Sequence, residues 1–355
     1  MLIQRMQPLL SICIPTFNRA RLLAQTLESI TKQNIYQKNL IEICISDNSS
    51  NNESKIVFDS FYKHYSNLYD LKYVRHEPAL DIDENMLFSA KMGSGDYIYW
   101  IGDDDCLGEN ALSSMVDYLH LKPDLLLINA EYRSEDLAQK LGLAFKQNQD
   151  CIYRDSSTVF KNFWCDEVFA QIHFGLFALK REAFQTTEIQ KFIKTYHAYS
   201  AIPLLYLATI ENFGNRTIDV RLLSTPLIII RCAERLKTWR SSMVDVYYLG
   251  IPNWLELMSS VPRYRELSLL KGRTFLNRLY SRKFIFKLLV SSDISIFSIP
   301  FPKLTRHRFV YVLLLFTPVK GYIIARRCRL YLKKLILVHV FGLSIKEIGR
   351  RCFKD

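Results

Sequence analysis

The sequence predicts an α/β fold in which helices flank an open mixed sheet that is mostly parallel. Strand and helix patterns alternate through the first 130 residues, as a parallel sheet with covering helices requires. The first strand, residues 9–16, is apolar almost throughout, as expected for a strand buried on both faces. Hydrophobic residues make up 49% of the chain and charged residues 23%, so a sizeable core can form and wholesale disorder is not expected.

The individual elements follow from the period of the apolar residues. In one segment, Leu23, Leu27 and Ile30 fall on the same face of a helix. Short apolar runs bounded by turn residues indicate the strands. The expected strands are residues 9–16, 40–47, 71–76, 96–101 and 123–130, and the expected helices are residues 21–32, 54–65, 85–92 and 109–120.

Beyond residue 130 the pattern is less regular. Residues 174–184 are typical of a strand that runs into a helix, and residues 217–231 of one or two strands. From about Leu236 onward helical spacing dominates, with aromatic and basic residues interleaved. We therefore expect two regions, an α/β domain of residues 1–235 and a basic, mainly helical region of residues 236–355.

The net charge of +12 is distributed unevenly. Residues 261–355 contain 21 Lys/Arg and four Asp/Glu, a net charge of +17, whereas the first 260 residues carry 26 Lys/Arg and 31 Asp/Glu, a net charge of −5. Such a tail favours an anionic partner, and its interleaved apolar and basic residues are typical of helices that lie on an anionic membrane surface. A helical subdomain with a solvated basic face is the alternative. No nucleic acid is expected, because no recognition motif accompanies the charge.

Cysteine spacing and the distribution of apolar runs indicate the compartment. The eight cysteines form no C-x-x-C pair and no zinc-like spacing, which argues against a disulfide framework and fits a reducing cytoplasm. The first residues lack the features of a signal peptide. No apolar run reaches the ~18 residues that a spanning helix needs, and the longest candidate, residues 309–319, is too short. We expect a cytoplasmic protein.

Three of the predicted strands end in polar clusters. These are "PTFNR" (15–19), "SDNSSNN" (46–52) and "GDDD" (102–105). Ligands of open α/β sheets bind beyond the carboxyl ends of the strands. One such cluster would be an ordinary turn or helix cap, but three at one edge predict a binding site.

The aspartate triplet predicts a site for a hard divalent cation. In an extended chain, Asp103 and Asp105 point to the same side and Asp104 points away. Carboxylate oxygens are the ligands that Mg²⁺ and Mn²⁺ prefer, usually together with substrate phosphates. The alternative is that Asp104 or Asp105 caps the helix that follows Gly108.

Asp47, at the end of the second strand, could accept hydrogen bonds from a nucleobase or ribose. Its alternative is an Asx-turn that opens "DNSSNN". The chain contains no G-x-G-x-x-G and no G-x-x-x-x-G-K-[ST] motif, which argues against the dinucleotide and P-loop classes. Without a glycine-rich phosphate cradle, a diphosphate would need a metal ion.

The ordered segments "LSICIPTFNRARLLAQTLESI", "EICISDNSS" and "DENMLFSAKMGSGDYIYWIGDDDCL" resemble the nucleotide-sugar domain of family 2 glycosyltransferases of the GT-A fold. The resemblance covers residues 8–130, and "FGLFALKREAF" resembles the acceptor-side segment of the family. The bacterial surface-polysaccharide transferases, including O-antigen types similar to abequosyltransferases, resemble it most. The resemblance implies that residues 1–235 bind the nucleotide sugar and carry out catalysis.

The resemblance also implies roles for individual residues. Asp105 would be the more direct metal ligand of the D-x-D motif, and Asp103 would lie nearer the ribose or sugar. Glu84 stands where many relatives carry Arg, which places the diphosphate contact of that Arg in doubt here. The residues expected to bind the nucleotide sugar are Pro15, Thr16, Phe17, Arg19, Asp47, Asn85, Asp103 and Asp104, and the expected ligands of Mg²⁺ or Mn²⁺ are Asp103 and Asp105.

Members of this family that invert the anomeric centre use a base to deprotonate the acceptor hydroxyl. Relatives usually supply an Asp or Glu, often in an E-D pair, some ten to thirty residues after a segment like "KREAF", but no E-D pair stands in that interval. The candidates are His197, Glu188 and Asp166, with Glu167 beside the last. His197 precedes a helical apolar run as the family's base does, although a lone His among aromatics is often only a packed residue.

The sequence therefore predicts a metal-dependent, inverting glycosyltransferase with a nucleotide-diphosphate sugar as donor. Its acceptor would be a saccharide, carried on a polyprenyl diphosphate, in surface polysaccharide (O-antigen, lipopolysaccharide) biosynthesis. The basic tail would hold the enzyme to the inner face of the cell membrane as a peripheral protein. The alternative is a non-catalytic nucleotide-sugar-binding or scaffold protein on the same fold. The oligomeric state, the donor sugar and the linkage are not predicted.

Overall fold

The computed structural model describes residues 7–34, 38–164, 173–186, 188–213, 216–232 and 245–279. The elements below belong to a compact unit, Met1–Leu279. The predicted boundary at residue 235 falls in a segment outside the described residues and stays a prediction. The basic tail beyond residue 279 also lies outside them. Within the described ranges, no helix is long and apolar enough to cross a membrane.

The strands of the described residues are β1 (Leu10–Thr16), β2 (Ile41–Asp47), β3 (Asp70–Arg75), β4 (Tyr97–Trp100), β5 (Cys106–Leu107), β6 (Leu125–Arg133), β7 (Lys140–Leu143), β8 (Cys151–Tyr153), β9 (Phe177–Lys180) and β10 (Val220–Arg231). The α-helices are α1 (Ala20–Thr31), α2 (Glu53–Tyr65), α3 (Ile82–Lys91), α4 (Ala111–Leu119), α5 (Ser156–Phe163), α6 (Ala183–Thr186), α7 (Ala198–Phe213), α8 (Ile251–Ser259) and α9 (Arg265–Leu279). A π-helical turn, Asp245–Gly250, precedes α8.

The strands form one mixed sheet, and the predicted α/β architecture is confirmed. Within the described residues its order is β3-β2-β1-β4-β9-β6-β10-β5, with β7 added beside β6 and β8 beside β10. β1 pairs in parallel with β2 and with β4, whereas β9 lies antiparallel between β4 and β6. β6 and β10 are parallel. The carboxyl ends of β1, β2, β4, β6 and β10 therefore share one edge of the sheet.

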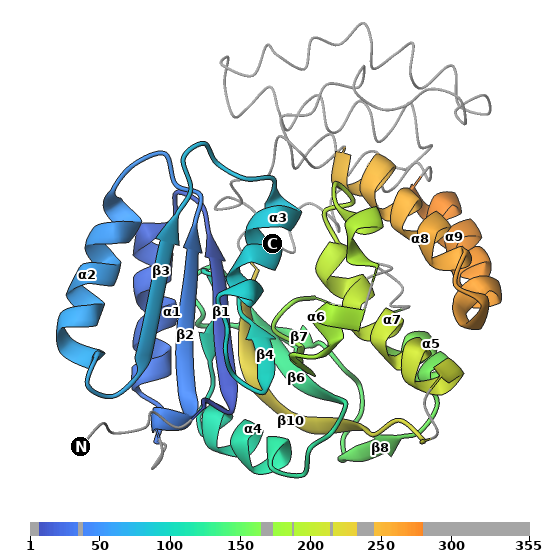
Figure 1. Cartoon of the computed structure of the whole chain (residues 1–355), viewed down its shortest axis with the longest axis horizontal. Helices are drawn as coiled ribbons and strands as arrows, with labels where there is room; N and C mark the ends of the chain where they lie inside the picture. The colour runs from blue at the N-terminus through green and yellow to red at the C-terminus, as the bar shows by residue number, and fades with distance from the viewer. Residues whose placement is uncertain are drawn as a thin grey trace, which may run out of the picture. The chain divides into compact units, whose positions relative to one another are not determined.

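Helices cover the sheet on both faces. Figure 1 shows α3 in front of the strands and α1 behind them. The face of α1 that the apolar period predicted is the buried one, since Leu23, Leu27 and Ile30 are at most 1% exposed. β2 is buried at every position, and Trp100 at the end of β4 is fully buried. This core holds the strand ends in place beneath the binding edge.

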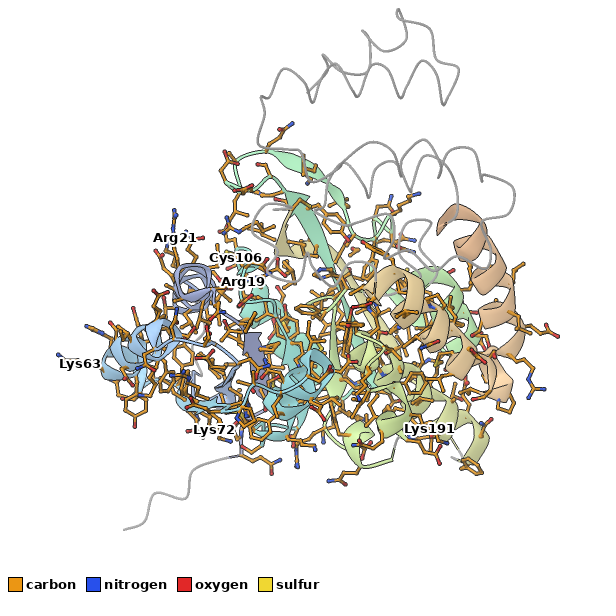
Figure 2. All side chains as sticks on the ribbon, turned by 90° about the horizontal axis from the view of Figure 1, so that it is seen from above. Arg19, Arg21, Lys63, Lys72, Cys106 and Lys191 are labelled. Atoms are coloured by element: carbon orange, nitrogen blue, oxygen red, sulfur yellow. The ribbon has the colours of Figure 1, made fainter. Side chains whose placement is uncertain are left out.

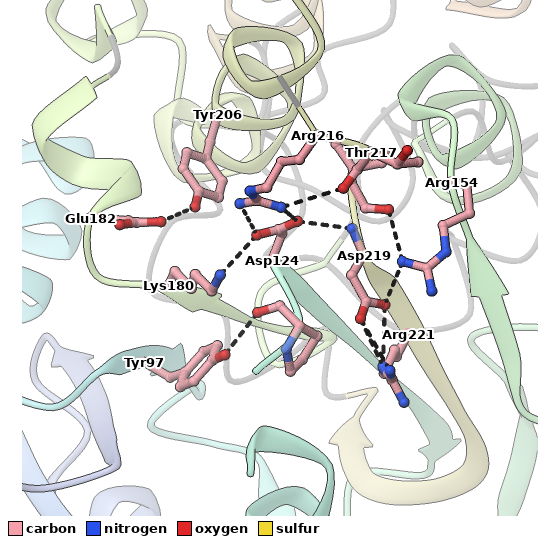
Figure 3. Close-up of polar contacts among 12 residues, drawn as sticks. Tyr97, Asp124, Arg154, Lys180, Glu182, Tyr206, Arg216, Thr217, Asp219 and Arg221 are labelled. Carbon is pink, nitrogen blue, oxygen red and sulfur yellow. Dashed lines mark hydrogen bonds and ion pairs between the residues drawn. The ribbon is translucent and has the colours of Figure 1, made fainter. Parts of the chain in front are cut away.

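The opposite, amino edge of the sheet is held by a cluster of ion pairs around one buried carboxylate, that of Asp124. Asp124, directly before β6, accepts hydrogen bonds from Lys180 at 2.9 Å and from both terminal nitrogens of Arg216 at 2.6 Å. The backbone N–H of Asp219 donates a further bond at 2.8 Å. Figure 3 shows these groups converging on Asp124 from β9 and from the segment before β10. Asp124 thereby joins three strands at the edge away from the triplet.

Candidate functional site at the carboxyl edge of the sheet

The loop after β1 and the loop after β2 are joined by hydrogen bonds. The backbone N–H of Asn18 donates to Ser49 Oγ at 2.8 Å, and the backbone N–H of Ser50 donates to Asn18 Oδ1 at 2.9 Å. Asn18 adopts a left-handed backbone conformation, with φ of 53°, which Asn tolerates better than most residues. Phe17 beside it is 43% exposed, so its ring is open to a ligand. Two of the three predicted polar clusters therefore lie together.

The aspartate triplet is a tight turn. The backbone N–H of Asp105 donates to the carbonyl of Gly102 at 3.2 Å, which closes a four-residue turn. The extended conformation from which the alternation of side chains was predicted is therefore wrong. The hydroxyl of Thr26 on α1 donates to the carbonyl of Asp105 at 2.7 Å, which holds the turn against α1.

Arg19 brings the first and third polar clusters together. Its Nη1 lies 2.9 Å from Asp103 Oδ1 and 3.2 Å from Asp104 Oδ2. The hydroxyl of Thr16 donates to Asp103 Oδ2 at 2.7 Å. Burial raises the pKa of Asp103 to about 6, against the opposing effect of Arg19. Figure 2 labels Arg19, directly before α1, and Cys106, the residue that follows the triplet.

Asp105 is only 1% exposed and is less completely paired than Asp103. Its Oδ1 accepts a hydrogen bond from the backbone N–H of Arg231 at 3.0 Å, but its buried Oδ2 has no partner in the described part of the chain. Burial and then the neighbouring Asp104 raise the pKa of Asp105 well above its usual value. A buried acceptor without a donor is costly, and a divalent cation would satisfy it. The residues present therefore fit a metal ion.

Two further observations bear on the metal prediction. Among the described residues, no group of three or more His, Cys, Asp or Glu side chains has an arrangement that could hold a metal ion. A cation here would therefore rely on substrate oxygens as well, as Mg²⁺ commonly does. The alternative of a helix cap is wrong, because Asn110 occupies the N-cap position of α4 and no side chain caps that helix.

Asp47 forms the Asx-turn that was its alternative interpretation. Its Oδ1 accepts from the backbone N–H of Ser49 at 2.7 Å, and its Oδ2 accepts from the hydroxyl of Tyr73 at 2.6 Å. Asp47 is fully buried. Asn85 is also buried, and its Oδ1 accepts from the hydroxyl of Ser46 at 2.7 Å. Both residues lie at the edge as expected, and their contact with a nucleotide stays a prediction.

Glu84 has a local structural role. Its carboxylate accepts from the backbone N–H of Asp81 at 3.1 Å, while Asp81 accepts from the backbone N–H of Asp83 at 2.9 Å. These bonds form a capping box at the start of α3. The capping box is a physical reason for a carboxylate where many relatives carry Arg.

The two base candidates within the described residues, Glu188 and His197, differ in their surroundings. Glu188 is exposed and pairs with Lys191, and Asp166 and Glu167 lie outside the described residues. His197 stands directly before α7, and both its ring nitrogens are buried without a hydrogen-bond partner in the described ranges. Burial and then the nearby His173 lower the pKa of His197 to about 3.

Asp83 and Arg231 are polar residues of this edge that the sequence alone did not single out. Asp83 accepts from the backbone N–H groups of Tyr196 and Ala198 at 2.8 and 3.1 Å, and so ties α3 to the start of α7 beside His197. Arg231 ends β10 next to the triplet. Each is an unremarkable charge in the sequence, because its partners lie more than 100 residues away.

The triplet and the loops after β1 and β2 all lie within one segment that matches a known family. Residues 11–187 match the family model described as glycosyl transferase family 2. The chain belongs to glycosyltransferase family 2. Over 131 residues it is 34% identical to abequosyltransferase RfbV of Salmonella typhimurium, an alignment that covers 37% of this chain and 38% of that relative. The family expected from the three motifs is thereby confirmed.

A second relative of this glycosyltransferase is GalNAc(5)-diNAcBac-PP-undecaprenol beta-1,3-glucosyltransferase of Campylobacter jejuni. It is 26% identical over 138 residues, which are 38% of this chain and 43% of that relative. The alignments with both relatives thus span less than half of either relative's length.

Solved structures share the fold. TarS of S. aureus matches with a TM-score of 0.55 and 15% identity, over 79% of this chain and 74% of that one. Mannosyltransferase PcManGT of Pyrobaculum calidifontis matches with a TM-score of 0.51 and 14% identity, over 96% of this chain and 89% of that one. The GT-A fold expected for this glycosyltransferase is confirmed.

Proposed function

We propose that this glycosyltransferase moves a sugar, with inversion, from a nucleoside-diphosphate sugar to a saccharide acceptor in bacterial surface polysaccharide synthesis. One observation carries the proposal: within the matched domain, Thr16, Arg19 and the aspartate triplet converge at the carboxyl edge of the sheet. Ligands of open α/β sheets bind at that edge. The exposed ring of Phe17 beside it offers a surface for the nucleotide.

Structures of the same fold support a nucleotide-sugar donor. TarS is described in complex with UDP and with UDP-GlcNAc, and PcManGT in complex with GDP-Man and Mn²⁺. These neighbours carry different nucleobases, so the proposal extends to the donor class and leaves the base open. Pro15, Asp47 and Asn85 line the same edge and belong to the proposed donor site.

We assign the metal-binding role to Asp105, with Asp103 as the second ligand. Asp105 offers a buried oxygen that has no donor among the described residues, whereas both oxygens of Asp103 already accept hydrogen bonds from Thr16 and Arg19. A bound Mg²⁺ or Mn²⁺ would stabilise the negative charge that develops on the departing diphosphate. Arg19, which also pairs with Asp104 at 3.2 Å, supplies a positive charge beside these carboxylates.

In the transfer itself, a base takes the proton of the acceptor hydroxyl while the hydroxyl oxygen bonds to the anomeric carbon. The bond from that carbon to the diphosphate breaks, and the nucleoside diphosphate leaves with the electron pair. His197 is the proposed base among the described candidates, because Asp83 fixes the backbone on both sides of it. Burial lowers the pKa of His197, so its imidazole is neutral and has a ring nitrogen free to accept a proton.

The acceptor is proposed to be lipid-linked. The Campylobacter relative is named for an acceptor on PP-undecaprenol. The net charge of +17 in residues 261–355 suits an anionic membrane surface, where such an acceptor would lie. Enzyme and acceptor would then meet as a peripheral protein and its membrane-bound substrate at the inner face of the cell membrane.

A Mn²⁺-dependent turnover screen across UDP-, GDP-, CDP- and dTDP-sugars tests the proposal, with release of nucleoside diphosphate as the measured quantity. We expect turnover of at least one donor. Asp105→Asn should lower it by about 100-fold or more, because a metal ligand supports several kcal/mol of transition-state stabilisation. Asp117→Asn, on the exposed face of α4, is the matched control and should leave turnover unchanged.

The same screen separates the enzyme from a scaffold. The specific observation that favours a scaffold is that both ring nitrogens of His197, the proposed base, are buried without a hydrogen-bond partner in the described part of the chain. Tight binding of a donor without turnover, even when lipid extracts supply acceptors, would support the non-catalytic function and overturn the proposed one.

A further inference from the structure

Arg231 reaches the aspartate triplet through the pairing of β10. β10 and β5 are antiparallel, and Ile229 lies opposite Cys106. The two residues that follow Ile229 in β10 therefore lie beside the triplet, which directly precedes Cys106. The pairing of β10 with β6 is irregular between Leu223 and Ile228, where the strand shifts its register. Such a bulge re-aims the end of a strand. Arg231, the last residue of β10, is thereby delivered to the turn.

Arg231 forms hydrogen bonds to the triplet and to two segments next to it. Its backbone N–H donates to Asp105 Oδ1 at 3.0 Å, and its Nε donates to the carbonyl of Asp104 at 2.9 Å. Its Nη2 donates to Gln25 Oε1 on α1 at 2.7 Å, and its Nη1 donates to the carbonyl of Glu135. One residue therefore holds the turn against α1 and against the segment that follows β6.

These contacts indicate a geometric role for the side chain. Among the described contacts, the Arg231 guanidinium donates to carbonyl and amide oxygens and to no carboxylate of the triplet. Arg19, by contrast, pairs with the carboxylates of Asp103 and Asp104. The Arg231 side chain fixes the backbone of Asp104, and its backbone N–H holds one oxygen of Asp105, which leaves Asp105 Oδ2 as the oxygen without a donor.

We propose that Arg231 is a positioning residue that holds the triplet turn in the shape that presents Asp105 Oδ2 to a divalent cation. The inference rests on the proposed function, because it presumes that the site takes a metal ion. Partners that orient metal ligands from the outer shell typically contribute 10- to 100-fold to metal affinity. Arg231 acts through Asp104 and Asp105 and makes no contact with the cation in this role.

The test measures the binding of Mn²⁺ alone to the full chain. Binding is monitored by the decrease of the free Mn²⁺ signal in electron paramagnetic resonance. We expect Arg231→Met to raise the Kd for Mn²⁺ by about 10-fold or more, with Arg231→Lys recovering part of the affinity. Arg133→Met is the matched control. Arg133 lies opposite Arg231 in the register of β6 and β10, but the described bonds of its side chain are to Glu131 and Leu137, not to the triplet.

A milder variant guards against loss of folding. Gln25→Leu removes the amide that receives Arg231 Nη2 and should raise the Kd by about 3-fold, with thermal unfolding unchanged. If wild type binds Mn²⁺ and both Arg231→Met and Gln25→Leu bind it equally well, the inference is overturned while the proposed function stands. If wild type itself binds no Mn²⁺, the metal-dependent function fails and the inference fails with it.

Discussion

Gly102 lies directly before the triplet, at a position with no room for a side chain. A Cβ there would stand 2.7 Å from Asp105 Oδ2 and 3.0 Å from Asp104 Oδ1. We expect Gly102→Ala to displace the Asp105 carboxylate and to lower donor turnover by about 100-fold, since misplacements of ~1 Å have effects of that size. Gly142→Ala is the control, because a Cβ at Gly142 meets nothing within 4 Å. Equal turnover of the two variants would contradict the proposed role of Asp105.

His197 gives the second prediction at this scale, through the pH dependence of folding stability. Burial lowers its pKa from 6.5 to about 3, so the unfolded chain binds the proton between these pH values and the folded chain does not. The free energy of unfolding should therefore be fully present above about pH 6.5 and fall by about 2 kcal/mol from pH 7 to pH 5.

Urea unfolding at the two pH values, in wild type and in His197→Gln, measures this effect. The substitution removes the titrating group, so the part of the pH dependence that His197 causes should disappear. If the free energy of unfolding depends on pH equally in wild type and in His197→Gln, the ring of His197 is accessible to solvent and free to take up a proton. In that case His197 would be a stronger base than its buried setting allows.

At the scale of elements, Asp124 holds the amino ends of β6, β9 and β10. Burial opposes its ionisation, but the hydrogen bonds from Arg216 and Lys180 outweigh burial and lower the pKa of Asp124. We expect Asp124→Asn to lower the free energy of unfolding by about 1–3 kcal/mol near pH 7, because Arg216 and Lys180 lose charge-assisted hydrogen bonds to a buried carboxylate, and the partial exposure of Arg216 lessens that loss.

The sign of the pH effect follows from the lowered pKa. The stabilisation by Asp124 is present above the pKa of an unfolded Asp, near 4, and is lost as the pH falls through the lower folded value. The difference between wild type and Asp124→Asn in urea unfolding should thus shrink below about pH 4. Asp117→Asn on α4, an exposed site, should change stability by less than about 0.5 kcal/mol.

The sequence predicts where the buried strands lie better than it predicts which strands pair with one another in the sheet. The apolar runs of β1, β2 and β6 mark buried strands, because burial depends on the local pattern. The insertion of β9 between β4 and β6 depends on pairing across the sheet, which no local pattern encodes. β5 and β8, two and three residues long, are too short to leave a period.

The same distinction holds for the site. Polar residues after apolar strands predict that Asp47, Asp103 and Asp105 lie at the carboxyl edge of the sheet, and the structure has them there, while their contact with a ligand stays a prediction. The turn at the triplet and its link to Arg231 were not found, because they depend on contacts with α1 and β10. Residue type predicted where the carboxylates stand, and tertiary contacts decide how they are oriented.

At the scale of the whole molecule, charge asymmetry predicts association with an anionic membrane. Residues 301–355 hold 13 Lys/Arg and two Asp/Glu, a net charge of +11. Each basic residue near such a surface contributes about 1 kcal/mol, and the attraction is screened by salt. The full chain should therefore sediment with phosphatidylglycerol vesicles, more weakly as salt rises, and not with neutral phosphatidylcholine vesicles.

Two variants test this prediction. Deletion of residues after Pro300 should release the protein from the anionic vesicles. Replacing Arg326, Arg327 and Arg329 by Gln keeps the length and removes three charges, so the affinity should fall by roughly 100-fold if all three lie at the surface. Unchanged sedimentation of both variants would mean that the basic residues form a solvated face of a helical subdomain. Donor turnover in solution should be the same in the Arg-to-Gln variant as in wild type, because the donor site is assigned to the carboxyl edge of the sheet and not to the tail.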